Sequence, residues 1–215
     1  MRNLRIWGIP AYYDLAQAEN RLMVEWVIQA EQRKGGVNRV GNRDIRYFLT
    51  ELIHDETFQD QYDRIIIDAP PRLTSACIQS FCAAQYLLIP TVLDGLSNEA
   101  VGSFIEQIKG LRDARVCPNL KIFGVIPYVP SKAINFKKLS REQITDILTR
   151  TDTEAILFRD KFEIPNLKWI TECAGTQIAY ATNANNKYVR KVRQVFDDLG
   201  DEIDRLIEEL RAAKI

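Results

Sequence analysis

The segment YDRIIIDAPP, residues 62–71, places three isoleucines directly before a carboxylate and two prolines. A short, uniformly apolar run of this kind predicts a β-strand buried on both faces, as in a parallel α/β sheet. The prolines end the strand because proline has no backbone N–H to donate. Asp68 then stands at the carboxyl end of the strand, where open α/β sheets bind ligands and where an aspartate commonly holds a magnesium–phosphate complex through water. A simple strand stop is the alternative interpretation.

The residues that follow predict alternating helices and strands. Leu73 to Ala84 has the pattern of a helix, and Gln85 to Thr91 that of a second buried strand. Ser97 is a candidate N-cap for a helix from Asn98 to Leu111, and Asn119 to Pro127 is a candidate third strand. This order is typical of right-handed βαβ crossovers, so the expected fold is a doubly wound, mostly parallel sheet flanked by helices.

Two further helices and a loop complete the expected organisation. A helical pattern runs from Leu15 to Arg33, and a long amphipathic one covers Asn185 to Lys214. The segment from Val129 to Lys138 is expected to be a basic, proline-containing loop. At 215 residues and 46% hydrophobic content, one α/β domain over residues 1–215 is the natural expectation. No apolar run approaches the length that spans a bilayer, so a cytoplasmic protein is expected.

The four cysteines and the single histidine offer little for catalysis. Cys77, Cys82, Cys117 and Cys173 form no C-x-x-C pair, so a zinc or iron–sulfur site is not expected, and buried free thiols suffice as an explanation. His54 ends the helical run RDIRYFLTELIHD, where it can contact terminal carbonyl groups. One histidine in this position disfavours a Ser–His or Cys–His hydrolase.

Several segments of the chain, in their order along the sequence, resemble those of the ParA/MinD family of partition ATPases, a branch of the P-loop NTPases. YDRIIIDAPP resembles the Walker B strand of that family, and AAQYLLIPTVLDGLSNEAV resembles its next strand and the following helix entry. Weaker similarities, in the same order as in the family, lie in LRIWGIPAYYDLAQAEN, LKIFGVIPYVPSK and LFRDKFEIPNLKWITECAGTQIAY. The resemblance extends from near Leu4 to near Leu210.

One family feature is missing from the sequence. No G-x-x-x-x-G-K-[ST] phosphate loop occurs in these residues, and the nearest string is KGGVNRVG, residues 34–41. That string follows a helical pattern and lacks the Gly-Lys-Thr that would bind phosphate and magnesium, so a helix C-cap and turn explains it better. The chain is therefore expected to lack the amino-terminal Walker A unit, and to bind ATP weakly or not at all. In the family, the strand before the phosphate loop is central to the sheet, and its loss is expected to leave an apolar face of the neighbouring strands exposed.

The resemblance also implies a function and a set of site residues. A complete family member would use ATP and Mg²⁺ for dimerisation, non-specific DNA binding and slow hydrolysis stimulated by a ParB-like partner, on the nucleoid, to segregate plasmid or chromosomal DNA or position a cargo. Asp68 would be the catalytic Walker B acid that holds magnesium through water, with Pro70 nearby, and Pro127 and Tyr128 would contact the base. A nucleotide-free interaction or DNA-binding module is the alternative.

Local charge supports a DNA contact more than net charge does. Lysines and arginines balance the acids at 29 each, but basic residues gather at the start of the last helix, opposite to the preference of the helix dipole. By resemblance, Lys168, Arg190 and Lys191 are the candidate contacts to DNA phosphate. An ordinary solvated helix face is the alternative interpretation.

Overall fold

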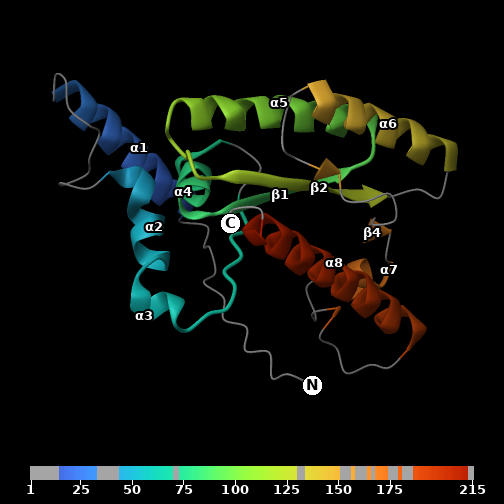
Figure 1. The fold of residues 1–215 in the computed structure, drawn as a ribbon. Helices are drawn as coiled ribbons and strands as arrows, with labels where there is room; N and C mark the ends of the chain where they lie inside the picture. The colour runs from blue at the N-terminus through green and yellow to red at the C-terminus, as the bar shows by residue number, and fades with distance from the viewer. Residues whose placement is uncertain are drawn as a thin grey trace. The chain divides into compact units, whose positions relative to one another are not determined.

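The computed structural model describes residues 15–32, 44–69, 73–129, 134–150, 156–157, 164–165, 168–173, 179–180 and 186–212 (Figure 1). The chain divides into two compact units. The first contains Met1–Leu87 and Gly110–Lys121, and the second contains Leu88–Lys109 and Ile122–Ile215. Because the chain crosses between the units three times, neither unit is a separate stretch of sequence, and the expectation of one domain stays a prediction.

The first unit is built from helices, three of which contact α4. Its described helices are α1 (Leu15–Gln32), the 3-10 helix η1 (Ile45–Tyr47), α2 (Phe48–Ile53), α3 (Glu56–Gln59) and α4 (Ser75–Ala83). α4 contacts α1, η1 and α2. The buried side chains of this unit include Ile45, Ile53, Cys77 and Phe81. These apolar residues form the local core, because their burial removes apolar surface from water.

A parallel sheet positions the remaining elements. Its strands are β1 (Tyr86–Val92), β2 (Lys121–Val129), β3 (Ile156–Leu157) and β4 (Ile164–Pro165), in the order β1-β2-β3 with β4 also paired to β2. Both β3 and β4 run parallel to β2. The N–H of Lys121 donates to the Gln85 carbonyl and that of Leu93 to the Tyr128 carbonyl, so the β1–β2 register advances in one direction and this pair is parallel as well.

Helices lie on both sides of this sheet within the second unit. α5 (Gly95–Asp113) and α6 (Ile134–Arg150) lie along one side of β1 and β2, and α8 (Lys187–Ala212) lies on the other (Figure 1). The short helix α7 (Lys168–Cys173) contacts α8. Successive residues Ile122 and Phe123 are only 2% and 4% exposed, so both faces of β2 are covered. The doubly wound α/β fold predicted from the sequence is confirmed.

α5 and α6 approach each other closely at a glycine. A Cβ atom added to Gly102 would lie 2.7 Å from Cγ2 of Ile147, closer than real Cβ atoms come to other atoms. Both residues are buried. The hydrogen at this position of α5 is therefore what allows the two helices to pack at this distance.

Most predicted elements are confirmed with shifts of a few residues, but three details differ. Asp94, rather than Ser97, caps α5: its Oδ1 accepts the Ser97 N–H at 2.7 Å, which places Ser97 inside the helix. The predicted loop over residues 129–138 is shorter, because β2 includes Val129 and α6 begins at Ile134. The third difference, at Asp68, is described with the candidate site below. None of the described helices is both long and apolar enough to cross a membrane.

Candidate functional site

The segment that leads to Asp68 is not a strand. Residues 64–69 have no helix or strand assignment, and Asp68 is exposed. The side chain of Ile66 is 93% exposed and that of Ile65 is 41% exposed. The prediction of a strand buried on both faces is therefore wrong for this segment. Pro70 lies outside the described residues.

Among the described residues, no strand pairs with this segment. A run of β-branched residues forms a strand only where a neighbouring strand bonds to its backbone groups. The described strands β1 to β4 pair with one another, and none of them pairs with residues 64–69. Ile66 is an exposed apolar side chain, and the expected loss of the first strand stays a prediction.

The helix that follows Asp68 begins at a carboxylate supplied by α1. Glu19 accepts hydrogen bonds from the Ala76 N–H at 2.6 Å and from the Ser75 hydroxyl at 3.0 Å, both in the first turn of α4. Burial raises the pKa of Glu19, but hydrogen bonds from Ala76, Thr74 and Ser75 outweigh it, so the pKa lies below its ordinary value. The anion-binding position at this helix start is thus taken by a side chain of the protein itself.

In the second unit, the carboxyl ends of β1 and β2 lie side by side. The Leu93 N–H donates to the Tyr128 carbonyl at 3.1 Å, and Asp94 follows at the start of α5. Pro127 is buried and Tyr128 is half-buried. Of the two predicted base contacts, only Tyr128 therefore offers side-chain surface to a ligand, and its contact with a base stays a prediction. Asp94 was missed by the sequence analysis; as the cap of α5, its carboxylate is already engaged.

The first turn of α8 is an exposed basic surface. Lys187, Arg190 and Lys191 are all exposed, and this turn contains no acidic residue. The Asn186 side-chain oxygen accepts the N–H groups of Tyr188 and Val189, at 2.9 and 3.0 Å. Because these backbone donors are used by the cap, an anion here would be bound by the basic side chains. We name Lys187, Arg190 and Lys191 the α8 basic turn.

The third candidate DNA contact, Lys168, is the first residue of α7. This six-residue helix is not predicted from the sequence. α7 contacts α8, which brings the backbone of Lys168 to the helix that carries the α8 basic turn. The predicted contact of Lys168 with DNA phosphate stays a prediction.

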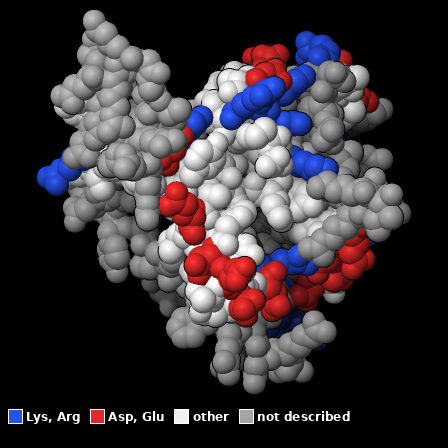
Figure 2. All heavy atoms as spheres, turned by 60° about the vertical axis from the view of Figure 1, so that its left-hand side comes forward, with Lys and Arg blue, Asp and Glu red and all other residues white. Residues whose placement is uncertain are grey.

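The α2–α3 segment has the opposite charge. Figure 2 brings this side of the molecule forward and shows Asp and Glu side chains gathered on it. The exposed acids of the segment and its neighbours are Glu51, Asp55, Glu56, Asp60 and Asp63. Phosphate groups would be repelled from such a surface, so a nucleic-acid contact is favoured at the α8 basic turn instead.

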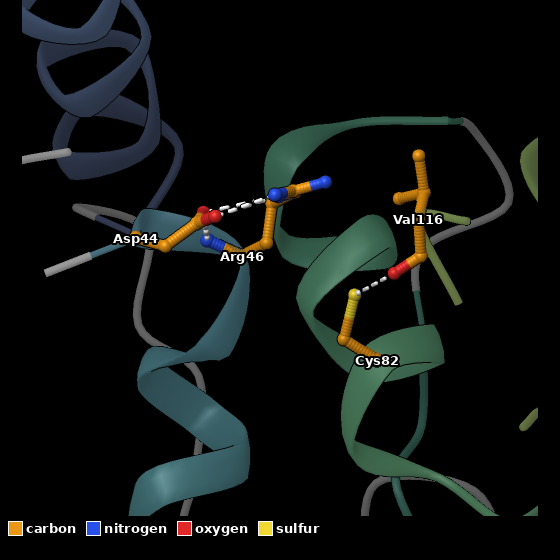
Figure 3. A network of polar contacts seen from close by, with 4 residues as sticks. All are labelled: Asp44, Arg46, Cys82 and Val116. Atoms are coloured by element: carbon orange, nitrogen blue, oxygen red, sulfur yellow. Dashed lines mark hydrogen bonds and ion pairs between the residues drawn. The ribbon is translucent and has the colours of Figure 1, made fainter. Parts of the chain in front are cut away.

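The four cysteines are free thiols, and burial disfavours the thiolate form of three of them. Burial is the main cause that raises the pKa of Cys77 and of Cys82 to about 11, and burial also raises that of Cys117. Figure 3 shows the Cys82 Sγ–H donating to the Val116 carbonyl, over 3.2 Å. Within the described part of the chain, no three His, Cys, Asp or Glu residues are grouped as metal ligands.

Figure 3 also shows the ion pair between Asp44 and Arg46 at the start of the 3-10 helix η1. Arg46 donates from its backbone N–H and its Nε to Asp44 Oδ1, at 3.1 and 3.0 Å. The hydrogen bond to Asp44 is the main cause that raises the pKa of Arg46. His54 lies within 3.0 Å of the Ala83 carbonyl through Nε2, so it contacts the last carbonyl of α4. These residues therefore have structural partners that account for them.

Comparison with solved structures identifies a similar fold. The cobyrinic acid a,c-diamide synthase of Mycobacterium smegmatis, solved with bound ADP and magnesium, aligns with a TM-score of 0.53 and 24% identity, over 74% of this chain and 54% of that protein. The same enzyme has been solved with an ATP analogue and magnesium. The chain thus spans about half the length of this protein.

Sequence relatives match shorter segments. An uncharacterised protein of Pseudomonas putida is 32% identical over 79 residues, which is 36% of this chain and 30% of the relative. An uncharacterised protein of Methanocaldococcus jannaschii is 28% identical over 89 residues, 41% of this chain and 34% of the relative. The model of the AAA_31 family, described as an AAA domain, matches residues 3–122. The chain therefore belongs to the AAA_31 family and has the fold of ParA/MinD-type P-loop NTPases.

Proposed function

We propose that this chain acts in a ParA-type partition system, in which a complete family member binds ATP and Mg²⁺, dimerises, and binds DNA non-specifically. Hydrolysis stimulated by a ParB-like partner would then release the DNA, so that a plasmid, a chromosome or another cargo is moved. The observation that carries this proposal is the family match over residues 3–122, which includes Asp68. The nucleotide and magnesium in the similar synthase support the same cofactors for a complete member.

The residues of this chain do not fit a complete nucleotide site. The sequence has no Walker A string, and phosphate affinity in such sites comes mainly from backbone N–H groups of that loop. Asp68 is exposed, and the start of α4 already holds the Glu19 carboxylate. We therefore expect the 215 residues alone to bind ATP weakly or not at all and to hydrolyse none. The ATPase activity belongs to a protein with a phosphate loop.

The contribution that these residues can make by themselves is DNA binding. The three cations of the α8 basic turn are exposed in one turn of one helix, and Lys168 begins the adjacent α7. Flexible, exposed cations suit phosphate oxygens irrespective of base sequence. This supports Arg190, Lys191 and Lys168 as phosphate contacts. It also supports the second candidate function, a nucleotide-free DNA-binding module derived from a partition ATPase.

Fluorescence anisotropy with a labelled DNA duplex tests the DNA contact. We expect the purified chain to bind the duplex with an affinity that falls steeply as the salt concentration rises. In the Arg190→Ala, Lys191→Ala double variant, the slope of log K against log salt concentration should be smaller in magnitude by about two. Arg150→Ala is the matched control, because Arg150 is an exposed arginine on α6 that pairs with Asp146 at 3.1 Å. Absence of binding at low salt, or equal losses in the control, would refute the DNA-binding role.

Calorimetric titration with ATP and Mg²⁺ separates the two candidate functions. No detectable heat from a folded sample supports the nucleotide-free module for the 215 residues. Micromolar binding that Asp68→Ala weakens would contradict the requirement for a phosphate loop and would make the chain a divergent nucleotide-binding protein.

A further inference from the structure

An exposed tyrosine lies within the α8 basic turn. The side chain of Tyr188 is 55% exposed, and the Lys187 ammonium lies 5.2 Å from the centroid of its ring. A large aromatic ring that is half accessible in water gains free energy when another flat surface covers it. In the sequence, charge marks this turn as a candidate contact, and the aromatic residue between Lys187 and Arg190 is a second signal.

The helix geometry arranges the cations and the ring in a defined order. At about 100° per residue, Arg193, Arg190, Lys187 and Lys191 follow one another around α8, and Tyr188 comes next. Val189 and Val192 are fully buried and occupy the remaining, inner part of the helix surface. A band of cations therefore crosses the outer surface of α8 and ends at the ring of Tyr188.

The other edge of the band also has a tyrosine, but its surroundings differ. The Tyr180 hydroxyl donates to Asp197 Oδ1 at 2.6 Å, and its ring packs edge-on against Phe196 with centroids 6.3 Å apart. Arg193 Nε donates to the Tyr180 carbonyl at 3.1 Å. The hydrogen bond to Asp197 is the main cause that raises the pKa of Tyr180. Tyr180 is thus held by the protein beside a carboxylate, which disfavours a phosphate group there.

We propose that Tyr188 is a stacking platform for an unpaired base, and that α8 thereby gives single-stranded nucleic acid a contact that a duplex cannot make. This role of Tyr188 rests on the proposed DNA-binding function of the same turn. Lys187, Arg190 and Lys191 contact the phosphates of the strand, and the ring of Tyr188 covers one base. In a duplex the bases are stacked on each other, so only the phosphate contacts remain. Exposed aromatic rings beside cations are how single strands are held without regard to sequence.

The test compares a single strand with a duplex at one fixed salt concentration. An oligothymidylate of about 20 nucleotides and a duplex of the same length are titrated with the chain by fluorescence anisotropy. We expect Tyr188→Ala to weaken binding of the single strand by roughly 5- to 30-fold and binding of the duplex by less than about twofold. Tyr188→Phe keeps the ring and should bind the single strand as the parent chain does.

Tyr180→Ala is the matched control, a second exposed tyrosine at α8 that should leave both affinities unchanged. Photo-crosslinking with an oligonucleotide that contains 4-thiothymidine gives an independent readout, because a base stacked on Tyr188 should yield a crosslinked peptide that includes residues 187–191. Equal losses for single strand and duplex, or no loss for either, would overturn the role of Tyr188 and leave phosphate binding by the basic turn intact. If the parent chain binds neither nucleic acid, the proposed DNA-binding function fails together with the role of Tyr188. If the parent binds both, the Arg190→Ala, Lys191→Ala variant loses binding and Tyr188→Ala does not, then only the role of Tyr188 fails.

Discussion

The close approach of α5 and α6 at Gly102 predicts an unusual response to a common stabilising substitution. Replacing glycine by alanine inside a helix ordinarily stabilises it by about 1 kcal/mol, because the unfolded chain loses conformational freedom. At Gly102 the new Cβ would lie 2.7 Å from Cγ2 of Ile147. That methyl group sits on a β-branched carbon in a helix, where one side-chain rotamer dominates, so it cannot turn away freely.

The two effects can be weighed against each other. Overpacking of a buried site costs about 1–3 kcal/mol, and the stiffness of Ile147 favours the upper part of that range. We therefore expect Gly102→Ala to lower the free energy of unfolding by about 1–2 kcal/mol after the helix-propensity gain, and Tm by roughly 2–8 °C for a chain of this size. Urea denaturation and thermal melts followed by circular dichroism measure both quantities.

Gly110 supplies the matched control in the same helix. A Cβ added there has no atom within 4 Å, so Gly110→Ala should stabilise the chain by about 0.5–1 kcal/mol. Ile147→Leu removes the clashing methyl group from Cβ, so the pair Gly102→Ala, Ile147→Leu should recover at least about 0.5 kcal/mol relative to the sum of the single variants. If Gly102→Ala stabilises the chain as much as Gly110→Ala does, the described packing of α5 on α6 is wrong.

Three further variants test other contacts. Glu19→Gln should lower stability by about 1 kcal/mol at pH 7. Because the folded pKa of Glu19 is depressed, its contribution is present above the ordinary value of 4.5 and is lost as the pH falls through the folded pKa, so the difference between the urea midpoints of parent and variant should shrink as the pH is lowered below 4.5. Thr74→Ala removes the N-cap of α4, whose hydroxyl accepts the Cys77 N–H at 3.4 Å. Thr74 also forms a side-chain hydrogen bond to Glu19, so the expected loss is about 1 kcal/mol, and a loss above about 2 kcal/mol in urea denaturation would contradict it. Ile66→Ser should leave Tm unchanged within about 2 °C, since the side chain is 93% exposed, and should raise the concentration at which the protein precipitates; a large fall in Tm would mean that Ile66 is packed.

Local sequence patterns were sufficient to predict the helices with regular apolar spacing and the strands with continuous apolar runs. α4, α5 and α8 show helical spacing of apolar residues, and β1 and β2 are continuous apolar runs, so each was found within a few residues of its bounds. The same rule failed at Ile65 to Ile67, because a strand also needs a partner, and the run itself contains no information about whether one is present.

The candidate site was predictable in its residue types and less so in its geometry. The sequence indicated Arg190 and Lys191 because they interrupt the normal charge order of a helix. It could not indicate that Pro127 is buried while Tyr128 is half-buried, since alternation along β2 is hidden when helices cover both faces. Nor could it reveal that Glu19 would reach α4, a contact between residues 57 positions apart.

The partly exposed isoleucine run before Asp68 also affects the expected half-life of this protein in a cell. Short β-branched segments are the ones most prone to cross-β association, and Asp63, Arg64 and Asp68 place charges on both sides of this one, which slows such association. Quality-control proteins act on the same kind of surface, even when the rest of the molecule is folded. We therefore expect the half-life of the protein to depend on chaperone and protease capacity, and a charged residue at position 66 to lengthen it.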